Sequence, residues 1–243
     1  MPVALVTGVS RTRGIAAAVA ERLRADGFTV VTAGWTPYDT EQHAGIDEQV
    51  GSDLQYDLGD PEAPFELLRA AEHRAGPVTA LVLAHTVDTG GGVFDVTAAS
   101  IDRHLAVNVR GFLLLMQAFA QRRREAREGG RIVLFSSGPP QTGSIAYGAS
   151  KGAIEWMTYA AATELGPLGI TVNAVNPGPN QTGWMSPEVE RAAAERTPLR
   201  RAGQPRDAAA LVAFLLSDDG AFINGQLITS DGGHGIAAGS WPR

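Results

Sequence analysis

Tyr147 and Lys151 are the residues whose types and spacing point most directly to chemistry. They stand four positions apart, and side chains at that spacing lie on one face of a helix, one turn from each other. A free phenol, with a pKa of about 10, is a poor proton donor or acceptor near neutral pH. A neighbouring ammonium favours the phenolate, so we expect Lys151 to lower the pKa of Tyr147 and make it a general acid or base. The spacing alone is a weak indication, because a surface tyrosine and lysine often share it.

A glycine-containing loop, residues 7–16, precedes the first predicted helix. Glycine allows a tight turn and close approach to a pyrophosphate, and a helix N-terminus adds free N–H groups and a positive dipole end. Dinucleotide-binding loops carry three glycines at set spacings, and alanine can take the third place. The spacing here is irregular, but it fits that pattern if Thr12 and Arg13 are an insertion, with Gly14 in the second place and Ala16 in the third. The alternative is an ordinary glycine-containing turn. The loop residues expected to bind a dinucleotide are Gly8, Ser10, Arg11, Arg13, Gly14 and Ile15.

The charges near the second predicted strand favour NADP(H) over NAD(H). Sites specific for NAD usually place a carboxylate near the end of this strand, where it binds the ribose 2′-hydroxyl. Here no acidic residue occurs from Thr32 onward until Asp39, whereas Arg11 and Arg13 stand in the loop and suit a 2′-phosphate through charge-assisted hydrogen bonds. We therefore predict NADP(H), with NAD(H) as the alternative. Trp35 either flanks the adenosine or packs at the strand end.

Short apolar runs alternate with helical patterns along the chain. Strands are expected at residues 3–6, 28–33, 54–56, 80–84, 131–135, 170–175 and 226–229, and helices at 15–25, 61–75, 100–121, 147–165 and 207–216. This alternation indicates a parallel sheet covered on both faces, and continuous apolar strands agree with burial on both sides. We predict a single-domain α/β fold with a doubly wound, Rossmann-type parallel sheet of seven strands. Ser100 is the expected N-cap of its helix, and the stretch after Asp231 is expected to be an irregular tail.

Composition excludes several function classes. The 243 residues carry a net charge of −6 and no cysteine, which argues against a nucleic-acid partner, disulfides and a thiolate metal site. No metal-ligand cluster is apparent. There is no signal-peptide pattern and no apolar run of the roughly 18 residues needed to span a bilayer. We expect a soluble cytoplasmic protein without a membrane partner.

Other short motifs follow the glycine loop in a fixed order. They are Asp57-Leu58, Asn108, Ser137 upstream of Tyr147 and Lys151, Asn176-Pro177-Gly178 with Thr182, Asn224-Gly225-Gln226 and Asp231-Gly232-Gly233. Each motif is weak alone. Together they make the chain resemble the short-chain dehydrogenase/reductase family over nearly its full length, and within it the beta-ketoacyl carrier-protein reductase-like subgroup.

The resemblance implies a catalytic tetrad and a reaction. Its members would be Asn108, Ser137, Tyr147 and Lys151. Hydride would pass between nicotinamide and a carbonyl or secondary alcohol substrate while Tyr147 exchanges a proton with the substrate oxygen. Ser137 would orient that oxygen, Lys151 would also bind the nicotinamide ribose, and Asn108 would hold a water of a proton relay.

The resemblance also implies further cofactor contacts. Besides the loop residues and Trp35, these are Asp57, Leu58, Ala84, His85, Asn108, Tyr147, Lys151, Pro177, Gly178 and Thr182. Two departures stand out. Leu83-Ala84-His85-Thr86 replaces the family's Asn-Asn-Ala-Gly, so His85 is either a ligand contact or a structural or exposed histidine. Only nine residues separate Ser137 from Tyr147, so the loop at 138–143 is expected to be tight and to reshape the substrate pocket.

Residues 179–201 are expected to form a flap over the substrate. Trp184 and Met185 either wall the substrate pocket, together with Ser137 and Tyr147, or anchor the flap. The helical segments 101–119 and 154–165 are apolar on more than one face. That pattern fits a homodimer or homotetramer, and it equally fits helices buried within a monomer.

Two competing functions remain at this level. One is a catalytically silent nucleotide-binding sensor or scaffold of the same fold, against which the complete tetrad argues. The other is halohydrin dehalogenase or epimerase chemistry, which the presence of Lys151, Gly8 and Gly14 disfavours. The sequence does not identify the substrate, the physiological direction or the stereochemistry.

Overall fold

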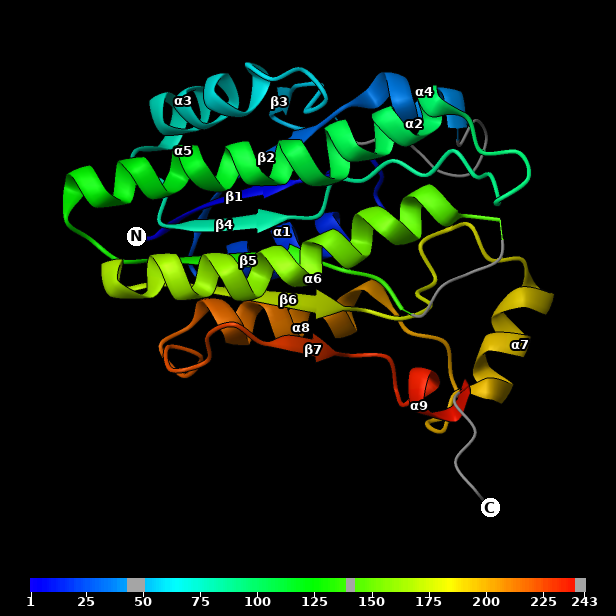
Figure 1. Cartoon of the computed structure of the whole chain (residues 1–243). Helices are drawn as coiled ribbons and strands as arrows, with labels where there is room; N and C mark the ends of the chain where they lie inside the picture. The colour runs from blue at the N-terminus through cyan, green and yellow to red at the C-terminus, as the bar shows by residue number, and fades with distance from the viewer. Residues whose placement is uncertain (43–50, 139–142, 239–243) are drawn as a thin grey trace.

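A seven-stranded parallel sheet forms the centre of the molecule (Figure 1). The computed structural model describes residues 1–42, 51–138 and 143–238. The strands are β1 (Val3–Thr7), β2 (Thr29–Gly34), β3 (Leu54–Gln55), β4 (Ala80–Leu83), β5 (Gly130–Phe135), β6 (Ile170–Asn176) and β7 (Leu227–Thr229). Their order is β3-β2-β1-β4-β5-β6-β7, and every neighbouring pair is parallel. The chain winds outward from β1 to one edge and then from β4 to the other, which confirms the predicted doubly wound fold.

Helices cover both faces of the sheet. They are α1 (Ile15–Ala25), α2 (Thr36–Gln42), α3 (Ala63–Ala75), α4 (Ala98–His104), α5 (Gly111–Ala126), α6 (Ile145–Leu165), α7 (Pro187–Arg196), α8 (Pro205–Leu216) and α9 (His234–Ala238). In Figure 1, α5 and α6 lie in front of the sheet, whereas α1 and α8 lie behind it.

Alternate side chains of the strands supply two hydrophobic cores. Leu5 and Leu81 pack with Phe112 of α5 on one face, and Val6 packs with Val212 of α8 on the other. Burial of a side chain of this size contributes about 1.5–3 kcal/mol. Because both faces are buried, the strands read as continuous apolar runs, and the sheet holds the loops at its carboxyl edge in place.

The predicted helix at 100–121 is interrupted and starts earlier. Helix α4 begins at Ala98, and the Thr97 hydroxyl accepts a hydrogen bond from the Ser100 N–H at 3.1 Å. Thr97 is therefore the N-cap, and the assignment of Ser100 was wrong. Thr97 has the extended backbone of a cap, whereas Ser100 lies in the first turn. A π-helical turn, Leu105–Arg110, then joins α4 to α5.

The chain after Asp231 is more ordered than predicted. The Asp231 carboxylate accepts hydrogen bonds from the N–H groups of Gly233 (2.8 Å) and Gly235 (2.7 Å), and α9 follows. The expected irregular tail is thus wrong as far as Ala238, and residues 239–243 lie outside the described part of the chain. The short helices α2, α4, α7 and α9 fell outside the predicted elements or at their edges, because they are too short for a clear periodic pattern.

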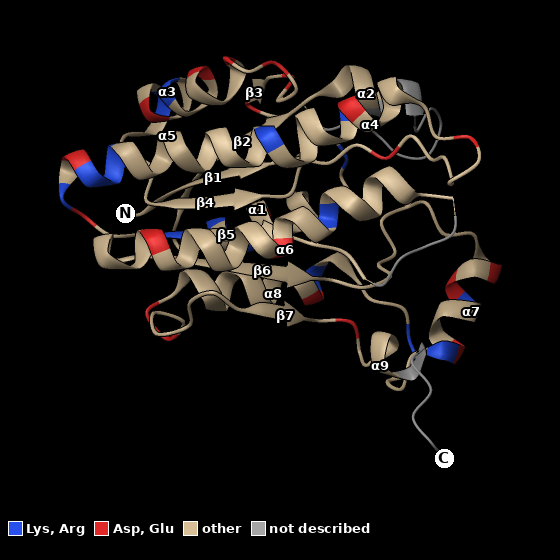
Figure 2. Cartoon of the chain, viewed as in Figure 1, with Lys and Arg blue, Asp and Glu red and all other residues tan. Residues whose placement is uncertain are grey.

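Basic and acidic residues alternate along the ribbon in Figure 2, and neither sign is confined to one set of elements. Lys151 is the one lysine in the sequence, so all other basic side chains apart from the histidines are arginines. Within the described ranges, no helix has the length and apolar character needed to cross a bilayer.

Candidate active site

A cavity of about 840 Å³ opens at the carboxyl-terminal edge of the sheet. Residues that follow β1, β2, β4, β5 and β6 line it, together with side chains of α6 and α7. In doubly wound sheets, ligands bind at this edge, where neighbouring strands lead the chain in opposite directions. Here that point lies between β1 and β4. All but two of the predicted site residues line this cavity; Arg13 and Asn108 do not.

The glycine loop forms one wall of the cavity, and its backbone leaves no room for a side chain at Gly8. Gly8 has a φ of +83°, and a Cβ at this position would lie 2.6 Å from the Ala84 carbonyl oxygen. Only glycine fits there. Gly14 is the N-cap of α1 and has no side chain to cover the first helical N–H groups, which stay open to an anion. Ser10, Arg11 and Ile15 complete this wall, and the exposed Arg13 side chain lies outside it. The predicted contact of Arg13 with the dinucleotide therefore lacks support.

Trp35 and Tyr38 line the cavity beyond the end of β2. Gly34 is needed here too, because a Cβ would lie 2.5 Å from the Val9 carbonyl oxygen. No carboxylate occurs at residues 34–36, and the side chain of Asp39 lies outside the described residues. Tyr38 was not predicted, and nothing in the sequence marks it, because α2 brings it to the cavity.

Asp57 and Leu58 line the cavity after β3. Asp57 accepts a hydrogen bond from the Gly59 N–H at 2.9 Å and forms an ion pair with Arg103 of α4 at 3.0 Å. Arg103 also lines the cavity and was not predicted. Its place at the cavity follows from the ion pair that joins α4 to the loop after β3, which no local pattern in the sequence indicates.

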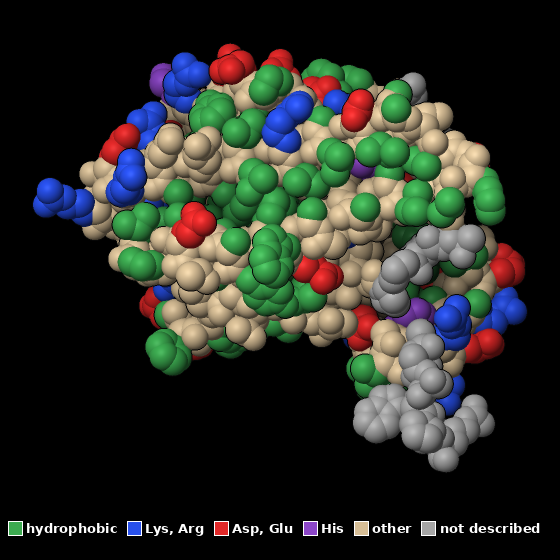
Figure 3. Space-filling view, in the orientation of Figure 1, with side chains coloured by type: hydrophobic (Ala, Val, Ile, Leu, Met, Phe, Trp, Pro, Cys, Tyr) green, Lys and Arg blue, Asp and Glu red, His purple; other side chains and the backbone are tan. Residues whose placement is uncertain are grey.

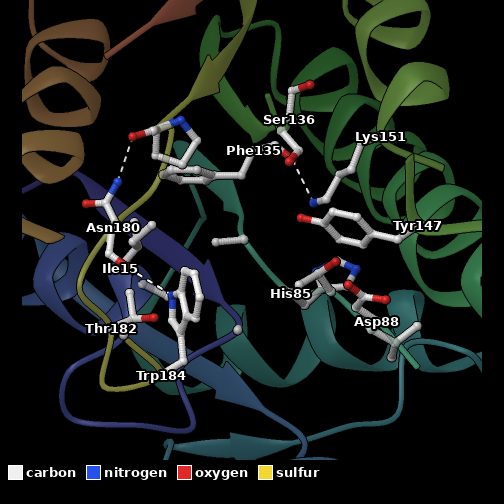
Figure 4. A pocket seen from close by; sticks show the side chains of 18 of the residues that line it. Ile15, His85, Asp88, Phe135, Ser136, Tyr147, Lys151, Asn180, Thr182 and Trp184 are labelled. Carbon is white, nitrogen blue, oxygen red and sulfur yellow. Dashed lines mark hydrogen bonds between the residues drawn. The ribbon is translucent and has the colours of Figure 1, made fainter. Parts of the chain in front are cut away.

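Tyr147 and Lys151 lie next to each other on α6 and face the cavity (Figure 4). The Lys151 Nζ donates a hydrogen bond to the Phe135 carbonyl oxygen at 3.0 Å and lies 5.5 Å from the centroid of the Tyr147 ring. Burial lowers the pKa of Lys151 to about 7, and the charge of Asp88 opposes this shift. Burial therefore disfavours the ammonium form of Lys151.

The pKa of Tyr147 is raised, which is the opposite of the expected shift. Burial of the phenol is the main cause, a hydrogen bond with the Ser137 side chain opposes it, and the charges of Asp88 and Tyr38 add to it. The expectation was wrong because burial disfavours the phenolate and weakens the charge of Lys151 at the same time. Ser136 also lines the cavity, but its hydroxyl donates to Glu155 Oε1 at 3.0 Å. Of the two serines, Ser137 is the one that interacts with Tyr147.

Asn108 lies in the π-helical turn and joins two parts of the site without facing the cavity. Its Oδ1 accepts from the Val87 N–H at 2.8 Å, and its Nδ2 donates to the Val87 carbonyl at 3.0 Å and to the Ser150 hydroxyl at 2.9 Å. The side chain thus ties the loop after β4 to α6, one position before Lys151. Single π turns inside helices are frequent at functional sites. The water-holding role of Asn108 stays a prediction.

The segment predicted as a flap contains α7 and forms the wall opposite Tyr147 and Lys151 (Figure 4). The Trp184 Nε1 donates to the Asn180 carbonyl at 3.0 Å, and Met185 is buried in a small cluster with Ala193. Both side chains also line the cavity, as do Pro177, Gly178 and Thr182. Trp184 and Met185 therefore anchor the segment and wall the cavity. The predicted tight loop at 138–143 lies largely outside the described residues, and flap motion stays a prediction.

The chain is similar in sequence to known proteins over nearly its whole length. A family model described as enoyl-(acyl carrier protein) reductase matches residues 8–235. The chain is 35% identical over 241 residues to an uncharacterized oxidoreductase, YjdA, of Bacillus subtilis, covering 95% of this chain and 96% of that one. It is 36% identical over 256 residues to versicolorin reductase stcU of Emericella nidulans, covering 95% and 94%. The protein belongs to the short-chain dehydrogenase/reductase family.

A solved structure agrees with the fold. A blue fluorescent protein from a metagenomic library, in complex with NADPH, is 32% identical, with a TM-score of 0.80 and coverage of 96% of this chain and 97% of that one. Members of this family are oxidoreductases that use nicotinamide cofactors.

His85, which departs from the short-chain dehydrogenase/reductase pattern, is buried rather than exposed, and its contact with a ligand stays a prediction. Its Nδ1 lies 2.8 Å from the Thr7 hydroxyl, and its ring packs 4.4 Å from the Phe112 ring, centroid to centroid. Burial, with a contribution from Lys151, lowers the pKa of His85 to about 3. The imidazole is therefore neutral under ordinary conditions. It borders the cavity while joining β1, β4 and α5.

We expect His85 to make this protein sensitive to acid. Its pKa is about 3 when folded and about 6.5 when unfolded, so the unfolded chain binds more protons between these values, and stability falls as pH falls below 6.5. The loss attributable to His85 between pH 7 and pH 5 is about 2 kcal/mol. Urea titrations at both pH values should show a smaller loss for His85→Asn than for the unmodified protein. His73→Asn, at an exposed position, serves as the control; an equal change in both variants would contradict the assignment.

Proposed function

We propose that this protein is a cytoplasmic NADP(H)-dependent oxidoreductase that transfers hydride between nicotinamide and a carbonyl or secondary alcohol substrate, with Tyr147 as the general acid or base. One observation carries the proposal. Tyr147, Lys151 and Ser137 meet in the same cavity as a loop at Gly8 whose backbone admits no side chain. The reductase names of relatives such as versicolorin reductase support the same reaction class.

The residues present fit a dinucleotide. Gly8, Gly14 and the open N-terminus of α1 suit the pyrophosphate. Among the residues that line the cavity, Arg11 and Trp35 would meet the adenosine ribose and Asp57 the adenine, whereas Pro177, Gly178, Thr182 and Lys151 would meet the nicotinamide end. The bound cofactor would supply or accept the hydride, and the protein supplies position and electrostatics.

The protonation state of Tyr147 suits reduction. Its raised pKa keeps the phenol neutral at neutral pH, so it can donate a proton to the carbonyl oxygen as negative charge develops there. Ser137, which interacts with Tyr147, would orient the same oxygen. Alcohol oxidation requires the phenolate, so the reverse reaction should become faster as pH rises. Trp184 and Met185 give the substrate end an apolar wall.

A homodimer or homotetramer is part of this proposal. Hydrophobic side chains gather over α5 and α6 on the face in Figure 3, and Leu113, Trp156 and Tyr159 are exposed there. Burial within a monomer, the alternative left open by the sequence, does not apply to these three side chains. A face of this kind suits a second copy of the chain.

Spectrophotometric assays test the function directly. Consumption of NADPH at 340 nm should occur with at least one member of a panel of aliphatic, aromatic and polycyclic ketones, and more slowly with NADH. Thermal-shift titrations with both dinucleotides should run in parallel. Tight NADPH binding without turnover of any carbonyl or alcohol in either direction would instead favour the silent sensor or scaffold.

Arg11 should decide the preference for NADPH. If it binds the 2′-phosphate, Arg11→Ala should raise the dissociation constant for NADPH roughly tenfold to hundredfold, because hydrogen bonds to charged groups contribute about 1.5–3 kcal/mol. The dissociation constant for NADH should hardly change. Quenching of tryptophan fluorescence provides the measurement. Arg13→Ala removes the same charge from an exposed side chain outside the cavity and is the matched control; equal weakening of both dinucleotides by Arg11→Ala would refute this role.

A further inference from the structure

Asp88, in the loop after β4, places a fixed carboxylate at the cavity. Its Oδ1 accepts a hydrogen bond from the Gly90 N–H at 3.0 Å, and its Oδ2 accepts one from the Ser144 hydroxyl at 3.3 Å. The Tyr38 hydroxyl holds the backbone from both sides: it accepts from the Asp88 N–H at 2.8 Å and donates to the Asp88 carbonyl at 3.1 Å. These contacts come from its own loop, from α2 and from the start of α6, so they position the carboxylate closely.

His104 lies close to the Asp88 carboxylate but donates no hydrogen bond to it among the described contacts. His104 Nε2 lies 3.8 Å from Asp88 Oδ1. The His104 Nδ1 lies 2.7 Å from the Ser100 carbonyl oxygen, so it carries the proton, and Nε2 faces the Thr89 N–H at 3.4 Å as an acceptor. In this arrangement Nε2 presents a lone pair, and no N–H, toward the loop that carries Asp88. No arginine or lysine of the described ranges forms an ion pair with Asp88.

Titratable groups of the proposed reaction centre line the same cavity as Asp88. In Figure 4, Asp88 and His85 lie on the same side of the Tyr147 ring. Tyr38 of α2, Tyr147 and Lys151 of α6, and the neutral His85 line the same cavity. The side chain of Asp88 is 40% exposed, so it borders the cavity without blocking it. The two hydrogen bonds that its carboxylate accepts from described residues leave part of its acceptor capacity unused.

We propose that Asp88 is a positioning residue that stabilises the ammonium form of Lys151 and the neutral phenol of Tyr147. Lys151 is buried, and its ammonium donates one hydrogen bond to a neutral carbonyl among the described residues. Burial alone would discharge such an amine. A carboxylate held nearby opposes that effect and disfavours a second negative charge on the phenol, which agrees with the directions of both pKa shifts.

The single lysine of the chain makes the inference measurable without any activity. Protein labelled with ¹³C,¹⁵N-lysine has one lysine side-chain resonance, from Lys151. Its titration between pH 5 and pH 10 gives the pKa of that amine directly. Asp88→Asn should lower the midpoint by about one pH unit, a tenfold change in proton affinity, because it removes the charge and keeps the shape. Ser144→Ala removes a contact to the carboxylate, keeps its charge, and should leave the midpoint nearly unchanged.

The outcomes separate this inference from the proposed function on which its catalytic meaning rests. The inference is overturned if the titration midpoint of Lys151 is unchanged in folded Asp88→Asn. It is also overturned if Ser144→Ala lowers that midpoint as much as Asp88→Asn does. Asp88→Ser gives the same readout if the asparagine variant does not fold. In an active enzyme, Asp88→Asn should also shift the alkaline limb of ketone reduction to lower pH, since both Lys151 and Tyr147 lose protons more readily. A lowered midpoint in a protein that reduces no carbonyl would support the role of Asp88 and overturn the proposed function instead.

Discussion

Replacement of Tyr147 by phenylalanine is expected to lower kcat for ketone reduction by roughly 10²–10⁴-fold, the usual contribution of a positioned general acid. The substitution removes only the hydroxyl and keeps the ring that lines the cavity beside Lys151. The dissociation constant for NADPH should therefore change by no more than about fivefold, because one neutral hydrogen bond contributes about 1 kcal/mol. Steady-state kinetics and fluorescence titration measure the two quantities separately.

Tyr159→Phe is the matched control for this prediction. Tyr159 lies on the same helix, α6, but is exposed and does not line the cavity. Its variant should keep full activity. If Tyr147→Phe reduced ketones as fast as the unmodified protein, the assignment of Tyr147 as the proton donor would have to be abandoned.

Gly8→Ala is expected to abolish measurable NADPH binding and to lower the melting temperature by roughly 5–10 °C. Gly8 has a φ of +83°, and the new Cβ would lie 2.6 Å from the Ala84 carbonyl oxygen and 2.7 Å from the His85 nitrogen. A side chain at positive φ costs on the order of 1–2 kcal/mol. The steric overlap adds to this, because the neighbour is backbone at the end of β4. In a chain of this length, each kcal/mol shifts the melting temperature by about 2–4 °C.

Gly27→Ala isolates the backbone component of that effect. Gly27 has a similar φ of +90°, but a Cβ there would meet no atom within 4 Å. We expect a smaller loss of melting temperature in this variant and unchanged NADPH binding. Equal behaviour of the two variants in thermal-shift titrations would show that close approach of the backbone at Gly8 is unimportant.

The electrostatic environment of Tyr147 differs from that of the simple tyrosine–lysine pair that the spacing of Tyr147 and Lys151 suggested. Lys151 does approach the phenol, yet burial raises the pKa of Tyr147 and lowers that of Lys151 to about 7. The two residues therefore suit proton donation in reduction better than proton abstraction at neutral pH. The position of Asp88 explains how a buried ammonium can persist beside the phenol.

Much of the site was visible in the residue pattern because it lies at the ends of strands. Gly8, Ala84, Ser137 and Gly178 each follow an apolar run, and parallel strands bring their carboxyl ends to one edge. The structure places all four at one cavity. Whether they act in catalysis or cofactor binding stays a prediction. Arg13 shows the limit of this reasoning, since loop membership does not determine which way a side chain points.

The amino-acid sequence by itself determined the doubly wound sheet, the glycine loop and the spacing of Tyr147 and Lys151, because each depends on local periodicity or on neighbours along the chain. Only the tertiary structure decided that Asp88, Tyr38 and Arg103 border the same cavity, and in which direction the pKa of Tyr147 shifts. Those properties depend on burial and on charges brought together from separate elements. Desolvation is a property of the packed interior, so no spacing of residues along the chain reveals it.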